Sequence, residues 1–146
     1  MKTFLFVVTT AVLAAALPCI LPAQNNTADQ PLVDFAGTWR GICQDGNPFV
    51  ILSIKVSGGA LAGDITIANM QGGNGQCATV IDPPSPDHAM KIDGARVRGN
   101  VFSFQGSQKA RFEMSLAGTQ TARLKFLGTP VEDAPWKLVK SADSSR

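Results

Sequence analysis

The chain has no tyrosine, one histidine and three cysteines among its 146 residues. It contains no Cys-x-x-Cys pair, and with His88 as the lone histidine it lacks the usual ligand set of a zinc site. The formal net charge is only +2, and the basic residues are dispersed along the sequence rather than grouped. Grouped basic residues are the usual sign of nucleic-acid binding. The sequence therefore predicts neither a metal site nor a nucleic-acid partner.

Motifs of catalysis are also scarce. No Gly-x-Ser-x-Gly nucleophile motif is present. His88 follows Asp87 in a proline-rich segment and is the one candidate general base, yet the sequence indicates no nucleophile for it. The glycine-rich segment Asn69–Gln76 lacks the Gly-Lys-Ser/Thr ending of a phosphate-binding loop. We therefore expect no catalytic residue, no cofactor and no enzymatic activity.

The N-terminus has the pattern of an export signal. After Lys2, residues 4–17 form an uncharged, mostly apolar run, which prolines follow too closely for a membrane-spanning helix. Ala23 offers a small residue for cleavage, so residues 1–23 are interpreted as a signal peptide. The alternative is a lipoprotein anchored at Cys19, although Pro18 stands where lipoprotein signals place a small residue. The expected location is secreted or periplasmic.

Two cysteines, Cys43 and Cys77, remain once residues 1–23 are removed. In an oxidising compartment such a pair indicates a disulfide, and a metal site or a reactive thiol is the alternative. On the chain-entropy estimate, closing this loop stabilises the fold by about 4 kcal/mol.

Beyond Phe35 the hydrophobic period is two, which predicts antiparallel strands with one buried face each. Longer strands are expected at 50–56, 61–67, 110–116 and 122–126, and shorter ones at 78–81, 90–92, 95–97, 101–105 and 136–139. Turns are expected at Gly58-Gly59, Asp93-Gly94 and Gly99-Asn100. No part of the mature chain has a helical period over ten residues.

The predicted fold is all-β: a small antiparallel up-and-down β-barrel of about eight strands, because closure removes exposed sheet edges. A β-sandwich satisfies the same pattern and is the alternative. Residues 24–34 are expected to be a flexible N-terminal segment, 35–140 a single barrel domain and 141–146 a disordered tail. Irregular loops are expected at 69–76 and 82–88.

The segment FAGTWRG, Phe35 to Gly41, resembles the Gly-x-Trp opening of lipocalins. The segments VILSIKVSGGALAGDI, MKIDGARVRGNVFSF and PWKLVK extend the likeness over nearly the whole mature chain, to small secreted bacterial barrels described as lipocalin-like. The resemblance implies that Trp39 closes one end of a barrel. It also implies a late basic residue over this tryptophan, here Lys137 or Lys140. The mature chain is shorter than a lipocalin.

The expected inward-facing side chains are bulky and apolar: Leu52, Ile54, Ile65, Phe104, Phe112, Met114, Leu124 and Phe126. They lack the polar groups that specific pockets add, so a filled interior is favoured, although an eight-stranded barrel can hold one small ligand. For a hollow barrel, the candidate ligand-binding residues are Trp39, Phe104 and Phe112. For a filled one, Trp39 is a plug packed against Phe35 and Trp136.

Two hypotheses for function follow. The first is a secreted, non-enzymatic binding domain that carries a small apolar ligand. The second is a packed barrel that acts through its rim loops on an extracellular protein, for example as an inhibitor of a hydrolase. In both cases a monomer without a membrane span is expected.

Overall fold

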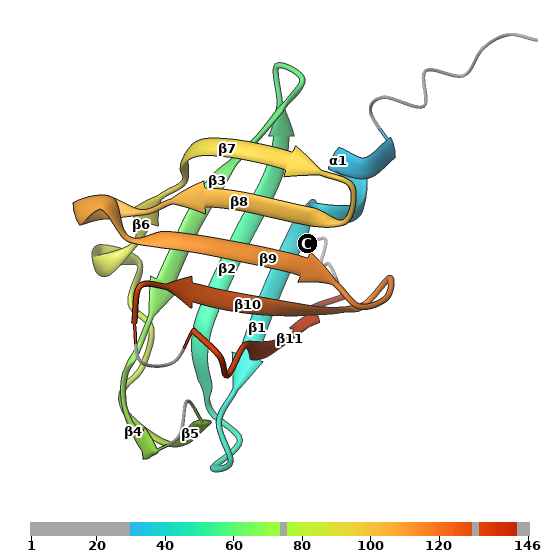
Figure 1. Cartoon of the computed structure of the whole chain (residues 1–146). Helices are drawn as coiled ribbons and strands as arrows, with labels where there is room; N and C mark the ends of the chain where they lie inside the picture. The colour runs from blue at the N-terminus through green and yellow to red at the C-terminus, as the bar shows by residue number, and fades with distance from the viewer. Residues whose placement is uncertain (1–29, 74–75, 130–131, 143–146) are drawn as a thin grey trace, which may run out of the picture.

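The computed structural model describes residues 30–73, 76–129 and 132–142, which form an all-β, antiparallel, nearly closed barrel (Figure 1). The elements are α1 (Gln30–Phe35), β1 (Gly37–Ile42), β2 (Pro48–Ser57), β3 (Ala60–Ile67), β4 (Asn69–Gly73), β5 (Gln76–Asp82), the 3₁₀ turn η1 (Pro86–His88), β6 (Met90–Lys91), β7 (Asp93–Arg98), β8 (Val101–Gln105), the 3₁₀ turn η2 (Ser107–Lys109), β9 (Arg111–Leu116), β10 (Thr121–Leu127) and β11 (Trp136–Lys140). The proposed signal peptide and Cys19 lie outside the described residues.

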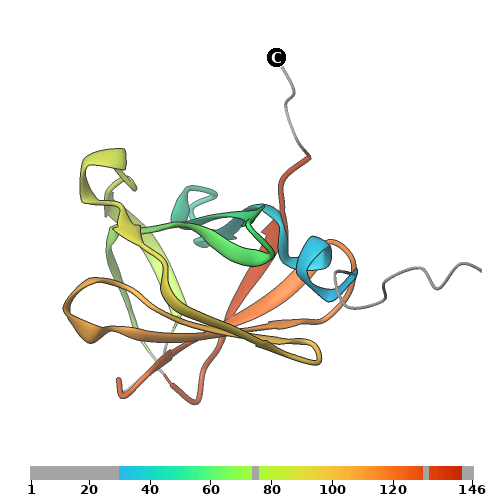
Figure 2. The same cartoon turned by 90° about the horizontal axis from the view of Figure 1, so that it is seen from above.

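Nine strands form the main sheet, in the order β6-β3-β2-β1-β11-β10-β9-β8-β7, and β4 and β5 form a separate hairpin. The all-β barrel prediction is confirmed, with nine strands where about eight were expected. Gly58 and Gly59 connect β2 to β3 with φ of 58° and 75°, the left-handed conformation that a two-residue type I′ turn requires. Strands β1–β3 and strands β7–β10 form opposite walls of the barrel (Figure 2).

The segment 90–98 closes the barrel. Its first part, β6, pairs with β3 at one sheet edge, and its second part, β7, pairs with β8 at the other edge. Between them the Ile92 N–H donates to the Gly63 carbonyl oxygen at 2.9 Å. Asp93 and Gly94, expected to form a turn, lie inside β7 at a register irregularity. A bulge bends a strand, which suits a segment that must join two edges.

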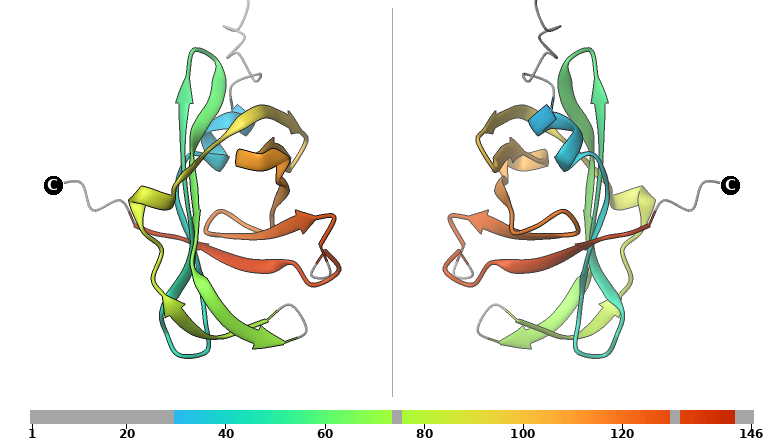
Figure 3. Two further views of the ribbon diagram at one scale, coloured as in Figure 1. Left: turned by 90° about the vertical axis from the view of Figure 1, so that its left-hand side faces the viewer. Right: turned by 90° about the vertical axis from the view of Figure 1, so that its right-hand side faces the viewer.

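Two segments differ from the sequence expectation. Residues 30–34, in the part expected to be flexible, belong to helix α1, which lies at one end of the barrel (Figure 3). The expected glycine-rich loop 69–76 forms β4 and the first residue of β5, and this hairpin crosses the opposite end of the barrel. Neither segment has a clean periodicity. Their structures depend on contacts with barrel ends that are distant in sequence.

The interior is filled by side chains. All but one of the predicted inward-facing residues are buried, and Phe126 is partly buried against the core. Seven aromatic rings form a continuous series with centroid distances of 4.7 to 6.4 Å. In contact order they are Phe35, Phe102, Phe104, Phe112, Phe126, Trp136 and Phe49. The series runs from the helix end of the barrel to the disulfide end.

Candidate functional site

The three candidate ligand-binding side chains belong to the packed core. Trp39, Phe104 and Phe112 are at most 2% exposed. Phe104 and Phe112 stack on each other, with ring centroids 5.1 Å apart and planes inclined by 19°. Trp39 lies separately at the helix end. The structure therefore joins two of the three candidates in the aromatic series and assigns the third to closing the barrel.

At the helix end, Trp39 joins three segments. Its indole Nε1–H donates to the Phe35 carbonyl oxygen at 2.8 Å, which fixes the end of α1 over the barrel. The Lys140 ammonium lies 5.2 Å from the centre of the Trp39 ring, within the range of a cation–π interaction. The same Lys140 Nζ donates to the Asp34 carbonyl oxygen at 3.3 Å. Of the two lysines that the lipocalin resemblance allowed, Lys140 is thus the one over the tryptophan.

Gly37 leaves the space that this lysine occupies. It has φ of 125°, and a Cβ at this position would lie 2.6 Å from Lys140 Cε. A larger residue would be strained and would displace the lysine from Trp39. The Gly-x-Trp spacing therefore places the glycine and the tryptophan on the same inward face, with room for Lys140 between them and α1.

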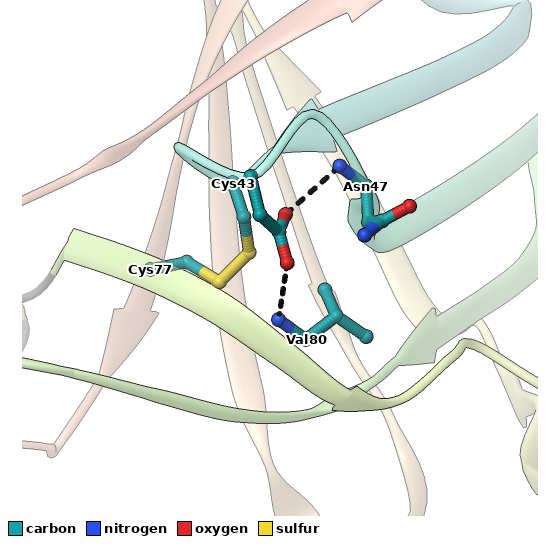
Figure 4. Close-up of a disulfide and its surroundings, with 5 residues drawn as sticks. Cys43, Asn47, Cys77 and Val80 are labelled. Carbon is teal, nitrogen blue, oxygen red and sulfur yellow. Dashed lines mark hydrogen bonds between the residues drawn. A yellow bond between two sulfur atoms is a disulfide. The ribbon is translucent and has the colours of Figure 1, made fainter.

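At the opposite end, a disulfide joins Cys43 to Cys77 with their Cα atoms 4.9 Å apart (Figure 4), which confirms the predicted pair. It connects the turn between β1 and β2 to the hairpin β4–β5. Two backbone bonds of 3.2 Å support the link, from the Gln44 N–H to the Cys77 oxygen and from the Asp45 N–H to the Ala78 oxygen. The hairpin is therefore attached to the barrel rim by two backbone hydrogen bonds as well as by the disulfide.

Asp45 is a further part of this attachment. Its carboxylate accepts from the Asn47 N–H at 2.9 Å and from the Val80 N–H at 3.0 Å (Figure 4). These two backbone hydrogen bonds, Asn47 first, lower the pKa of Asp45, because they favour the charged form. This role of Asp45 was not predicted from the sequence. The Asp-Gly-Asn turn after Cys43 was the available signal, since aspartate often accepts backbone hydrogen bonds in turns.

A shallow groove of about 280 Å³ lies beside the disulfide. Gln44, Gln76 and Lys137 give it polar edges, and the ring of Trp136 and the disulfide itself form apolar walls. Ile42, on the same groove, is 49% exposed. The groove is open and has polar edges, so it does not enclose a ligand as small-molecule pockets do.

His88 lies exposed at the end of η1. Ser85 is close in sequence, but its hydroxyl accepts the Asp87 N–H at 3.3 Å and caps the 3₁₀ turn. Among the described residues, no hydrogen bond of the His88 imidazole is found that would pair it with a nucleophile. In the same residues no cluster of three His, Cys, Asp or Glu side chains is placed to hold a metal ion.

Within the part of the chain that the structure describes, no helix has the length and apolarity needed to cross a membrane. Comparisons with protein-family models, with curated proteins and with solved structures found no match. No function can therefore be transferred from a relative, and the residues of this chain are the basis for the proposal below.

Proposed function

We propose that this chain is an exported, non-enzymatic binding domain of the lipocalin-like type, whose barrel is filled and which acts through its disulfide-linked rim on an extracellular protein. The observation that carries the proposal is the aromatic series through the interior. A carrier of an apolar ligand needs an interior cavity, whereas this interior is occupied by the protein's own rings. The Gly37-x-Trp39 opening with Lys140 over its indole supports the lipocalin-like part.

The rim has the order that a protein-binding surface requires. The disulfide, the two backbone bonds to β5 and the Asp45 carboxylate hold the rim loops in place before any partner arrives. Preorganised loops lose less conformational entropy on binding and so bind more tightly. Ile42 offers an exposed apolar contact at this rim. A secreted hydrolase is a partner class that fits such a preorganised rim, and this chain would act as its inhibitor.

The disulfide also supports export, because such bonds persist mainly in oxidising compartments. Intact-mass measurement of protein from the medium or periplasm tests the signal peptide. We expect a mass that begins at or near Gln24. A mass that retains residues 1–23 would contradict secretion by cleavage, and a diacylglyceryl adduct on Cys19 would favour the lipoprotein.

The choice between protein binder and carrier can be tested directly. We expect a fluorescent apolar probe to show no saturable binding to the folded chain, and the chain to inhibit at least one enzyme in a panel of secreted peptidoglycan hydrolases, proteases and glycosidases. Ile42→Glu should abolish the inhibition. Val56→Glu, an equally charged change at an exposed valine on the other end of the barrel, should preserve it.

Saturable probe binding with quenching of tryptophan fluorescence would favour the carrier instead. Inhibition that both variants lose equally would place the contact surface elsewhere.

A further inference from the structure

One wall of the barrel presents an outer face that is mainly basic. This face, the outer side of β7–β11, carries six exposed cations: Arg96, Arg98, Arg111, Arg123, Lys125 and Lys137. Two acidic side chains on these strands also point outward: Glu113 on β9, and Asp93 on β7 opposite Gln105. The strands β7–β10 lie side by side at the front of Figure 1, so the face is continuous.

Strand register aligns these cations, which are scattered over the sequence. One cross-strand row contains, in order, Arg98, Val101, Ser115, Arg123 and Lys137. The next row contains Arg96, Ser103, Glu113 and Lys125. Strands are about 4.8 Å apart, so Arg98 and Arg123 are separated by about 14 Å. The cations therefore form a two-dimensional array with hydroxyl groups between them.

The array is poorly neutralised by the protein itself. The ion pair found among the described residues joins Lys91 to Asp64 at 2.7 Å, on the opposite wall. Arg123 and Lys137 lie directly opposite each other on neighbouring strands, an arrangement that repels and costs stability. A bound anion would relieve this repulsion.

A groove of about 310 Å³ lies within the same face. Its polar lining consists of Arg96, Ser103, Gln105, Arg111 and Glu113. The guanidinium groups of Arg96 and Arg111 can each bind a carboxylate or sulfate through two parallel hydrogen bonds. The serine, the glutamine and the glutamate can exchange hydrogen bonds with neutral hydroxyls. A ligand that suits this groove carries both anionic groups and hydroxyls, as an acidic sugar does.

We infer that the outer face of β7–β11, with this groove over β7–β10, binds an acidic polysaccharide. Both tryptophans are buried, the phenylalanines of β8–β10 are buried or partly buried, and the sequence has no tyrosine. Among the described residues, this face therefore offers no exposed aromatic platform for nucleic-acid bases and no aromatic anchor for a membrane interface. The inference goes beyond the proposed rim function and involves a different groove, although Lys137 lies at the border of both surfaces.

The test is binding of the full secreted chain to fluorescent polygalacturonate, with uncharged dextran of the same length as control. We expect saturable binding to polygalacturonate alone, weakening steeply between about 50 and 300 mM salt because bound counterions are released. Arg96→Gln with Arg111→Gln should weaken it about tenfold or more, since two charge-assisted contacts are lost. Arg40→Gln with Lys55→Gln, the same change of charge on β1 and β2, should weaken it less than about twofold, by the screening of distant surface charges.

Circular dichroism of each variant is the control for folding. Three results would overturn the inference: no saturable binding, equal weakening by both double variants, or tighter binding to duplex DNA or to phosphatidylglycerol vesicles than to polygalacturonate.

Discussion

The two ends of the barrel are closed by different kinds of interaction. At the helix end, Phe35 and Trp39 are fully buried, and a hydrogen bond and a cation–π contact connect them to α1 and β11. At the disulfide end, the closing hairpin β4–β5 is largely exposed and is attached by Cys43–Cys77 and a few hydrogen bonds. Burial closes one end, whereas a covalent link closes the other. Because the hairpin β4–β5 is held by a covalent link rather than by burial, its exposed side chains can contact a partner without being needed for the fold.

If burial dominates at the helix end, Trp39→Ala should have the largest effect. Loss of a buried tryptophan leaves a cavity and unpairs the Phe35 carbonyl, so we expect the free energy of unfolding to fall by about 3–5 kcal/mol. Urea denaturation measures this. Val33→Ala, at a 57% exposed position on the same helix, is the control and should change stability by at most about 0.5 kcal/mol. Similar losses in the two variants would mean that α1 does not close the barrel.

Removal of the disulfide should have the next largest effect and a different character. Cys43→Ala with Cys77→Ala should lower the free energy of unfolding by about 2–4 kcal/mol, mainly because the unfolded chain gains freedom. Amide exchange should quicken in β4 and β5 far more than in β9 and β10. Exchange that rises uniformly across the sheet would show that the hairpin and the barrel unfold as one unit.

The lysine over Trp39 should make a smaller contribution. Lys140→Gln removes the cation from the indole face, and we expect a loss of about 0.5–1 kcal/mol. Lys137→Gln, on the outward face of the same strand, is the matched control: it removes the same charge but also the repulsion with Arg123, so it should not lower the thermal midpoint. An equal shift in both variants would assign the effect to net charge rather than to the contact with Trp39.

The smallest effect is expected at Asp45 and should depend on pH. Because hydrogen bonds from Asn47 and Val80 lower its pKa in the folded chain, its contribution is complete above the ordinary aspartate pKa of about 3.9 and is lost as pH falls through the lower folded value. NMR titration should show the Asp45 carboxyl titrating below that ordinary value. The Val80 amide should become less protected in Asp45→Asn at neutral pH. A titration at or above the ordinary value would contradict the attachment.

Much of the fold was predictable because its cause is local. Alternation such as Phe112-Glu113-Met114 gives each strand its buried face, and Gly58-Gly59 supplies a turn that few other residues can adopt. The Cys43–Cys77 disulfide was predictable from the expectation of export, because two cysteines in an oxidising compartment have each other as partners. Trp39, Phe104 and Phe112 were recognised as inward-facing for the same local reason, whichever role they had.

Other features were decided by contacts between segments far apart in the chain. Helix α1 has too few residues to form by itself, and its distant contact is with Lys140, which donates to the Asp34 carbonyl oxygen across 106 residues of sequence. The Asp45 attachment requires β5 to pass beside the first turn, 35 residues later in sequence.

The basic array is the clearest case. Arg98, Arg123 and Lys137 appear unrelated in the sequence, because alternation says which face of a strand a residue occupies and not which residues lie beside it. Sheet order and register set those neighbours, and they are fixed only when the whole barrel closes. The sequence by itself determined most of the strands and the disulfide, and it favoured a filled interior. The tertiary structure alone decided how the two ends close and where the charges gather.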